Sequence, residues 1–325
     1  MKNNIITFRE AIRSALSEQM LKDKRTILIG EDIGLYGGAF GVTRGLIDKF
    51  KDQIIETPIS ENSFVGVALG AAIGGYKPIV EIMFSDFVTL AMDQIINHAA
   101  KIRYIYAGQL NAPLIIRLPT GGGRGYGASH SQSLEAWFAH IPGLVVLYPS
   151  TPQDAKGLML SAMQEKSPVI YFENKLLYDV KGSVNTNSNN IPIGSAKVLK
   201  NGEDVSLISY GRMLKFAEEA SISLEQLGIS AEILDLRSLK PLDENKIIQS
   251  VKKTGRVIVI TESVSFSGIA AEVSALLADK CFDYMKSPIS RITAMDVPIP
   301  SATRLEKNIF PNTEKIIEEA VKLVN

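Results

Sequence analysis

The chain has 325 residues, a length that predicts about two domains of ordinary size. Hydrophobic residues make up 46% of it and charged residues 22%, which is the composition of a globular protein and excludes a disordered chain. The 35 Lys and Arg residues balance the 35 Asp and Glu residues, so the overall charge argues against a nucleic acid partner and against binding to an anionic membrane surface.

The first half of the chain alternates short apolar strands with helices. Apolar or small residues at helical spacing predict helices over 7–22, 63–75, 90–106 and 151–164. Short apolar runs predict strands over 26–30, 78–83, 113–118, 145–148 and 169–173, with one more helix before 145. This alternation favours an α/β fold with a parallel sheet covered by helices on both faces. In the helix over 63–75, Gly66, Gly70 and Gly74 share one face, where another backbone can approach closely.

The segment 181–192 marks the clearest change in composition, because it is polar, rich in Asn and without periodicity. It predicts a linker between a first domain over 1–180 and a second domain over 193–325. In the second half, strands are predicted over 205–210, 231–236, 257–261 and 289–294. Helices are predicted over 213–227, 243–253, 268–280 and 313–324. Both halves are therefore expected to be α/β.

Cysteine and histidine are scarce. The lone Cys281 excludes an intrachain disulfide, and the three histidines show no spacing typical of a zinc site. The amino terminus places Arg9 and Glu10 where a signal peptide needs an apolar core, and the apolar stretch 64–76 is about a third too short to span a bilayer. We therefore expect a cytosolic or matrix protein with no membrane partner.

A glycine-rich loop follows the strand over 113–118. Gly123, Gly125 and Ala128 match the G-x-G-x-x-A form of a dinucleotide fingerprint, which also needs a helix starting at the loop and an acidic residue about 20 positions later. Here the loop continues through Ser129 and His130, and a Pro-Gly turn stands where the acidic residue is needed. We expect no nicotinamide site, and the absence of P-loop and G-x-S-x-G motifs argues against nucleotide hydrolysis and serine hydrolase chemistry.

Glu61 lies between a turn that contains Pro58 and the small-residue helix, so its carboxylate is expected at the amino end of that helix. A carboxylate in this position either caps the helix, where the dipole stabilises it, or lies in an apolar, glycine-lined pocket suited to proton transfer. The residues by themselves leave both interpretations open.

Two aromatic residues and one histidine are further candidates. Phe84 and Phe87 fall in a strand-to-helix loop, where an aromatic ring either fills the core or stacks on a planar ligand. His130 lies in a loop of Gly, Ser and Gln, a setting that favours a functional role and a structural role of this histidine about equally. His98, within a predicted helix, and His140, close to Pro142, are expected to be structural.

Several longer motifs, taken in order, add a family resemblance that covers essentially the whole chain. They are GEDIG, ETPISE, EIMFSDF, MDQIINHAAK, the ASHSQ loop, HIPGL, PSTPQDAKGL and PVIYFENKLLY, then SYGRM, DLRSLKPLD, SVKKTGR and DVPIP. With these motifs the chain resembles the beta subunit of the thiamin-diphosphate-dependent decarboxylase component of 2-oxo acid dehydrogenase complexes, of the pyruvate and acetoin dehydrogenase type. The resemblance implies a transketolase-like architecture: a pyrimidine-binding α/β domain followed by a smaller carboxy-terminal α/β domain.

The resemblance also implies roles for the candidate residues. Glu61 matches the glutamate that hydrogen-bonds the aminopyrimidine ring of thiamin diphosphate, and Phe87 matches an aromatic position beside that ring. His130 matches a loop histidine near the channel through which the lipoyl arm enters. Glu61 and His130 are therefore the expected catalytic residues, and Glu61 and Phe87 are the expected cofactor-binding residues.

One absence bears on the partners. Thiamin-diphosphate enzymes carry a GDG…N segment that binds Mg²⁺ and the diphosphate, but this chain contains no Asp-Gly dipeptide. The family pattern implies that an alpha subunit supplies this half of the site, in a heterotetramer of two alpha and two beta chains. The expected further partners are a lipoyl-bearing dihydrolipoyl acyltransferase core and a small 2-oxo acid.

Some family members also hold a potassium ion with backbone carbonyls. The matching positions are Leu114, Ala162, Met163, Glu165 and Ser167. Carbonyl ligands leave almost no signature in side chains, so this expectation rests on the resemblance alone.

Pyruvate is the predicted substrate, with acetoin the second choice because SYGRM and NKLLY look at least as similar to acetoin-type chains, and branched-chain 2-oxo acids the third. Two hypotheses of other classes stay open. One is a transketolase or deoxyxylulose-phosphate synthase relative that works as a single chain, against which the missing GDG segment argues. The other is a non-catalytic assembly chain, against which the presence of Glu61 argues.

Overall fold

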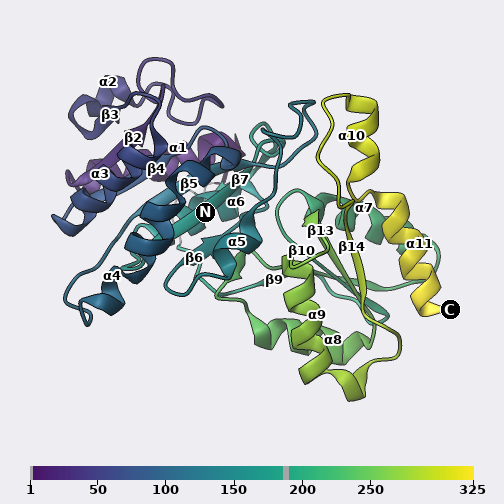
Figure 1. The fold of residues 1–325 in the computed structure, drawn as a ribbon. Coiled ribbons are helices and arrows are strands. Elements are labelled where there is room, and N and C mark those ends of the chain that lie inside the picture. Colours follow the sequence, from purple (N-terminus) through teal and green to yellow (C-terminus); the bar gives the residue numbers. More distant parts are fainter. Residues whose placement is uncertain (1–2, 186–189) are drawn as a thin grey trace. The chain divides into compact units, whose positions relative to one another are not determined.

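The computed structural model describes residues 3–185 and 190–325 (Figure 1). The chain divides into two compact units. Met1–Gly121 and Trp137–Ile193 form the first unit, and Gly122–Ala136 and Gly194–Asn325 form the second. The glycine-rich loop therefore belongs with the carboxy-terminal half, although its place in the sequence is within the first predicted domain.

The first unit is built on a parallel sheet. Its strands lie in the order β6-β7-β5-β4-β2-β3, and each neighbouring pair is parallel. The strands are Thr26–Gly30 (β2), Ile54–Glu56 (β3), Lys77–Glu81 (β4), Ile115–Thr120 (β5), Val145–Leu147 (β6) and Val169–Asn174 (β7). Strands β2, β5 and β7 are buried along their whole length, as expected where helices cover both faces. The predicted α/β fold is confirmed.

Three helices cover this sheet. Helices α1 (Phe8–Lys22) and α6 (Pro152–Ala162) pack against each other on one face, and α3 (Glu61–Ile73) packs against β4 from the other (Figure 1). Helix α1 begins with a capping box between Thr7 and Glu10. Helix α6 begins with Thr151 as its cap and Pro152 in the first turn, a favoured combination at helix starts.

The prediction of one continuous helix over 90–106 is wrong. The segment forms a 3-10 helix over Ser85–Ala91, a π-helix over Gln94–Ala99 and only then α4 over Ala100–Ile105. These segments of 7, 6 and 6 residues are too short for sequence periodicity to distinguish their different periods. A Cβ atom on Gly66 of α3 would lie 3.3 Å from the Oε1 atom of Gln94, so the predicted close approach at this glycine is made by a side chain.

The predicted linker begins with regular structure. Lys181–Asn185 forms strand β8, which pairs antiparallel with β1 (Asn3–Thr7). Polar residues form this strand because the ladder uses backbone groups, which no periodicity of side chains reveals. Residues 186–189 of the linker lie outside the described residues.

The second unit contains a five-stranded sheet in the order β14-β13-β10-β11-β9. Strands β10 (Val205–Ser209), β11 (Ala231–Asp235), β13 (Val257–Val264) and β14 (Ser290–Ala294) are parallel, and β9 (Lys197–Lys200) pairs antiparallel with β11. Helices α7 (Met213–Gln226) and α11 (Thr313–Val324) pack together on one face, and α8 (Glu244–Thr254) and α9 (Ile269–Lys280) pack together on the other (Figure 1). The predicted helices and strands of this half are confirmed.

Several short elements are not apparent from the sequence. They are α2 (Ile47–Phe50), β12 (Ser238–Lys240), α10 (Thr303–Ile309) and two 3-10 turns at Lys51–Gln53 and Phe282–Tyr284, whereas α5 (Glu135–Ala139) is the helix predicted before residue 145. Among the residues described, none of the helices combines the length and the apolar character needed to cross a membrane.

Candidate active site

Glu61 is the first residue of α3, and only 5% of its surface is exposed. Ser60 occupies the N-cap position without a capping hydrogen bond, and the Glu61 carboxylate accepts no hydrogen bond from the described part of the chain. The helix dipole stabilises a negative charge here, but a buried carboxylate ordinarily also has hydrogen-bond partners. This geometry favours the second interpretation of Glu61, as a carboxylate whose hydrogen bonds are left for a ligand.

A second buried carboxylate, Glu31, lies next to Glu61. It follows Gly30, the last residue of β2, so it stands at the carboxyl end of a parallel strand, where open α/β sheets bind ligands. Burial, with the charges of Glu61 and Asp32, raises the pKa of Glu31 to about 7. Its Oε1 atom is buried and has no hydrogen-bond partner within the described residues. A carboxyl group that titrates near neutrality is suited to holding or passing a proton.

Phe84 and Phe87 lie in the segment that follows β4. The 3-10 helix that contains Phe87 packs against α3, so Glu61 and Phe87 belong to adjoining elements. The ring of Phe84 meets those of Phe87 and Phe40 edge-on, with centroids 5.9 and 5.4 Å apart, and Tyr178 stacks on Phe40 at 5.3 Å. Phe84 is therefore held between other rings, and Phe84 and Phe87 are both half-buried.

A buried ion cluster joins the strands from which these residues emerge. The guanidinium of Arg117 in β5 donates to both carboxylate oxygens of Glu173 in β7, at 2.7 and 2.8 Å, and to Glu81 at the end of β4. The hydroxyl of Tyr178 donates to the same Glu173 carboxylate at 2.7 Å. Burial disfavours the charge of Arg117, but the two carboxylates outweigh burial and raise the pKa of the guanidinium. The cluster ties together the three neighbouring strands β4, β5 and β7, and Glu81 ends β4 shortly before the segment that contains Phe84.

The residues predicted to hold potassium lie around one end of the same sheet. Leu114 precedes β5, Ala162 and Met163 end α6, and Glu165 and Ser167 lie in the turn before β7. The Leu114 carbonyl accepts the Val169 amide at 2.8 Å, and the Ala162 carbonyl accepts the Glu165 amide at 3.1 Å. Each carbonyl oxygen has a second lone pair, so these bonds do not exclude an ion. The potassium site stays a prediction.

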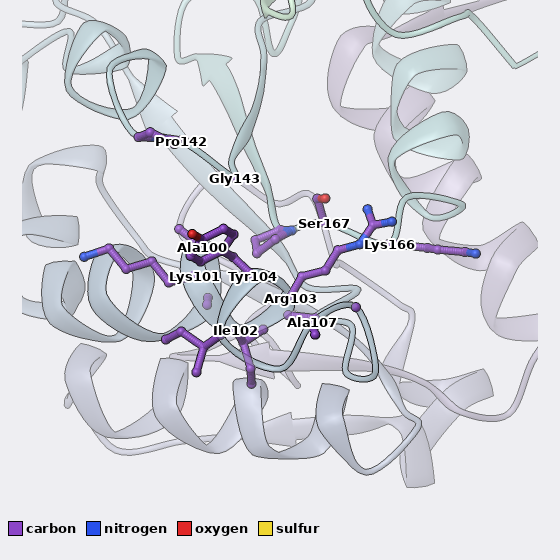
Figure 2. A pocket seen from close by; sticks show the side chains of 15 residues that line it. Ala100, Lys101, Ile102, Arg103, Tyr104, Ala107, Pro142, Gly143, Lys166 and Ser167 are labelled. Atoms are coloured by element: carbon purple, nitrogen blue, oxygen red, sulfur yellow. The ribbon is translucent and has the colours of Figure 1, made fainter.

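A groove of about 1140 Å³ opens beside this turn (Figure 2). Its walls are α4 with the turn that follows, Pro142 with Gly143, and 166–168. Figure 2 shows the side chains of Lys101 and Lys166 extending to opposite sides of the view. Ser167 is the one predicted site residue in the lining, so the groove is not assigned to the reaction.

His130 belongs to the second compact unit, whereas Glu61 and Phe87 belong to the first. Its side chain is half-buried, and the Ser129 hydroxyl lies 2.9 Å from its Nδ1 atom. Its backbone amide donates to the Gly127 carbonyl at 3.3 Å. These contacts orient the imidazole within its own loop.

The backbone amides of the glycine-rich loop bind carboxylates of the same chain. Gly122 donates to Glu262 at 2.8 Å, and Gly123 and Gly125 donate to Glu306 at 2.7 and 2.8 Å. A pyrophosphate would have to displace two carboxylates to reach these amides. This arrangement agrees with the expectation that the loop is not a dinucleotide site.

Glu31 and Arg117 are not among the residues predicted from the sequence. A signal for each exists: Glu31 directly follows a buried strand, and Arg117 interrupts an apolar strand, where a charge requires a partner. What the sequence does not reveal is the identity of the partners, because Glu61 and Glu173 are distant along the chain.

Two domain families match the chain. The transketolase pyrimidine-binding domain matches residues 4–181, and the transketolase C-terminal domain matches residues 194–316. Together these families account for nearly the whole chain.

Relatives of similar length carry dehydrogenase names. The chain is 42% identical over 320 residues to the pyruvate dehydrogenase E1 component subunit beta of Rickettsia bellii, covering 98% of each protein. It is 42% identical to the mitochondrial pyruvate dehydrogenase E1 component subunit beta-2 of Oryza sativa subsp. japonica, covering 97% of this chain and 85% of that protein. It is 41% identical to the acetoin:2,6-dichlorophenolindophenol oxidoreductase subunit beta of Bacillus subtilis, covering 98% and 97%.

Solved structures share the fold at lower identity. A split-gene transketolase, solved as an inactive beta4 tetramer, superimposes with a TM-score of 0.82 at 23% identity over 98% of both chains. A transketolase mutant from Pichia stipitis gives a TM-score of 0.70 at 16% identity, over 99% of this chain and 47% of that one. These similarities support a transketolase-like fold.

Proposed function

Because this chain belongs to the transketolase-like family of dehydrogenase beta subunits, we propose that it is the beta subunit of the decarboxylase component of a pyruvate dehydrogenase complex. The observation that carries this proposal is the buried carboxylate of Glu61 at the amino end of α3, next to a second buried carboxyl group, Glu31. In this role the chain takes part in oxidative decarboxylation of a 2-oxo acid, with the disulfide of a lipoyl group as acceptor.

The family implies thiamin diphosphate as cofactor, and the residues of the first unit fit it. The Glu61 carboxylate and the Oε1 atom of Glu31 are buried polar groups with unused hydrogen-bonding capacity, and Phe87 has a partly exposed ring. When bound, this cofactor supplies the carbon nucleophile that attacks the 2-oxo group and takes up the electrons left by carbon dioxide.

The chain's own residues would control the proton at the aminopyrimidine ring. Glu61 would hydrogen-bond a ring nitrogen and so favour the ring form that acts as a base. Glu31 would carry a proton through much of the neutral range, because its pKa is about 7, and this limits the negative charge next to Glu61. Phe87 would pack against the ring and exclude water.

An alpha subunit would complete the site. The chain contains no Asp-Gly dipeptide, so the residues that bind Mg²⁺ and the diphosphate would come from the alpha chain. The names of the relatives, which are subunits designated beta, support a partner of this kind. The proposed assembly has two alpha and two beta chains and is inactive without the alpha chain.

The second half of the reaction is assigned to His130 and the carboxy-terminal domain. His130 would orient or protonate the lipoyl dithiolane during acyl transfer, and the domain over 193–325 would dock on the acyltransferase core. The proposed division into 1–180, a linker over 181–192 and 193–325 is supported by the two matching domain families, which end and begin near these limits.

Acetoin is the alternative substrate. The Bacillus subtilis relative named for acetoin is nearly as similar to the chain as those named for pyruvate, which supports this alternative. Branched-chain 2-oxo acids are a third choice. The alpha chain would build part of the substrate pocket, so kinetics with the assembled enzyme and the three substrate types distinguish them.

Purification from the native host tests the half-site argument. We expect an equimolar partner that carries a GDG…N segment. Recovery of a homodimer that binds thiamin diphosphate by itself would contradict the proposal and favour a single-chain enzyme.

Glu61→Gln tests the chemistry in the assembled enzyme. The heterotetramer should form as before, and turnover should fall by about two orders of magnitude or more, the scale of a lost acid–base group. Glu272→Gln, an exposed position on α9, is the matched control and should retain activity. Activity of Glu61→Gln equal to that of the control would exclude the proposed proton role.

A further inference from the structure

The sheet of the second unit has the reversal of strand order at which other α/β proteins bind ligands. From β10 the chain passes to β11 on one side, and it later returns to β13 on the other side of β10. Where the strand order reverses in this way, a crevice opens at the carboxyl ends of the two central strands. Tyr210 follows β10 at this edge, and Glu262 lies near the end of β13.

In this protein a segment of the chain itself, the loop 122–136, is bound at this edge of the sheet. The Gly122 amide donates to Glu262 at 2.8 Å, and the Tyr210 hydroxyl donates to Glu135 at 2.7 Å. Glu135 is completely buried, and burial raises the pKa of its carboxyl group. Both ends of the loop are thus fixed at the carboxyl edge of the sheet.

Between these ends, Glu306 of α10 holds the loop by its backbone. The two oxygens of its carboxylate accept the amides of Gly123 and Gly125, at 2.7 and 2.8 Å, and only 1% of the residue is exposed. The Phe310 ring packs so close to Gly122 that a Cβ atom there would clash with it. His130 follows five residues after Gly125.

The loop has little structure of its own with which to keep its shape. Five of the seven residues 121–127 are glycine, and no helix or strand lies between β5 and α5. Gly123 and Gly125 have φ angles of +93° and +71°, which glycine adopts readily. A chain so rich in glycine has many conformations, so contacts from outside the loop must select one. Charge-assisted hydrogen bonds to a buried carboxylate are among the strongest contacts for this purpose.

We propose that Glu306 is a positioning residue for acyl transfer, because its carboxylate holds the glycine-rich loop in the conformation that presents His130. This inference rests on the role proposed above for His130. It gives the carboxy-terminal domain a part in the reaction besides docking: the edge of its sheet where the strand order reverses binds the loop that carries His130.

The experiment uses the enzyme assembled with its alpha subunit and compares Glu306→Ala, Glu306→Gln and the control Glu272→Ala. Amide hydrogen exchange in a peptide covering 121–130 measures how firmly the loop is held. Decarboxylation with an artificial electron acceptor and acyl transfer to a free lipoyl domain are measured separately. The glutamine variant keeps an acceptor oxygen without the charge, and it serves if the alanine variant does not assemble.

In Glu306→Ala we expect exchange in the loop to rise by about tenfold or more, the scale of one lost charged hydrogen bond. Acyl transfer should fall by about tenfold while decarboxylation changes by less than about twofold, because the effect is confined to the His130 step. Glu306→Gln should lie between Glu306→Ala and the unchanged protein in both measurements, and Glu272→Ala should match the unchanged protein.

Unchanged exchange in the loop of Glu306→Ala would overturn the inference. So would faster exchange with normal acyl transfer, provided that His130→Ala impairs transfer. Equal losses in both assays for His130→Ala would instead contradict the proposed role of His130, and the exchange data would still report whether Glu306 holds the loop.

Discussion

Replacing Arg117 with Met should expose how strongly the first unit depends on its buried ion cluster. The substitution removes a guanidinium that is 1% exposed and bonds two carboxylates, those of Glu173 and Glu81. Methionine fills much of the same volume, so the principal loss is electrostatic. Removing one partner of a buried ion pair costs about 3–5 kcal/mol, because the remaining charge stays buried without compensation.

This free energy corresponds to a large thermal shift. For a domain of the size of the first unit, each 1 kcal/mol lost from the free energy of unfolding lowers the unfolding temperature by about 2–4 °C. Arg117→Met should therefore unfold at a temperature roughly 10 °C lower than the unchanged protein. The measurement is a thermal scan of the purified enzyme in which circular dichroism monitors unfolding. Arg103→Met, an exposed position on α4, is the matched control and should shift the transition little.

The loss should depend on pH in a defined direction. Burial, with the charge of Glu173, raises the pKa of the Glu81 carboxyl group in the folded protein, and removing Arg117 takes away the charge that opposes this rise. Stability linked to a raised pKa is fully present below the unfolded value and is lost as pH rises through the folded value. The deficit of Arg117→Met should therefore be larger at pH 8 than at pH 5.5, and adding Glu81→Gln should restore part of the stability. Equal stability of Arg117→Met and Arg103→Met would refute this reasoning.

Two further predictions concern Glu31 and the ion site. Burial and the neighbouring Glu61 raise the pKa of Glu31 to about 7, so the folded state loses stability as pH rises through that value. The stability of Glu31→Gln, measured against that of the unchanged protein in thermal scans, should therefore be more favourable at pH 8 than at pH 5. A stability difference that does not depend on pH would contradict this prediction. If the carbonyls around Leu114 and Ala162 hold potassium, the thermal transition should be higher in KCl than in NaCl or tetramethylammonium chloride at equal ionic strength, because an ion that binds only the folded state stabilises it. Identical transitions in the three salts would argue against the site.

The local order of the chain follows from its sequence. Apolar runs alternating with helical periodicity predict parallel sheets, because such strands are buried on both faces, and the predicted helices and strands of the second half lie where the periodicity places them. The position of Glu61 at the start of α3 follows in the same way from a turn and a small-residue helix. The break of the predicted helix 90–106 into 3-10, π and α segments does not, because these segments of 7, 6 and 6 residues are too short for their different periods to show in the sequence.

Only the tertiary structure brings the distant partners together. Glu31 and Glu61 come from a strand end and a helix start, and burial together with the charge of Glu61 raises the pKa of Glu31. Glu306 bonds amides more than 180 positions earlier in the chain and so assigns the loop that carries His130 to the carboxy-terminal half. The physical reason is that periodicity reports which side of an element is buried, whereas the partner of a buried charge depends on which elements the fold makes neighbours.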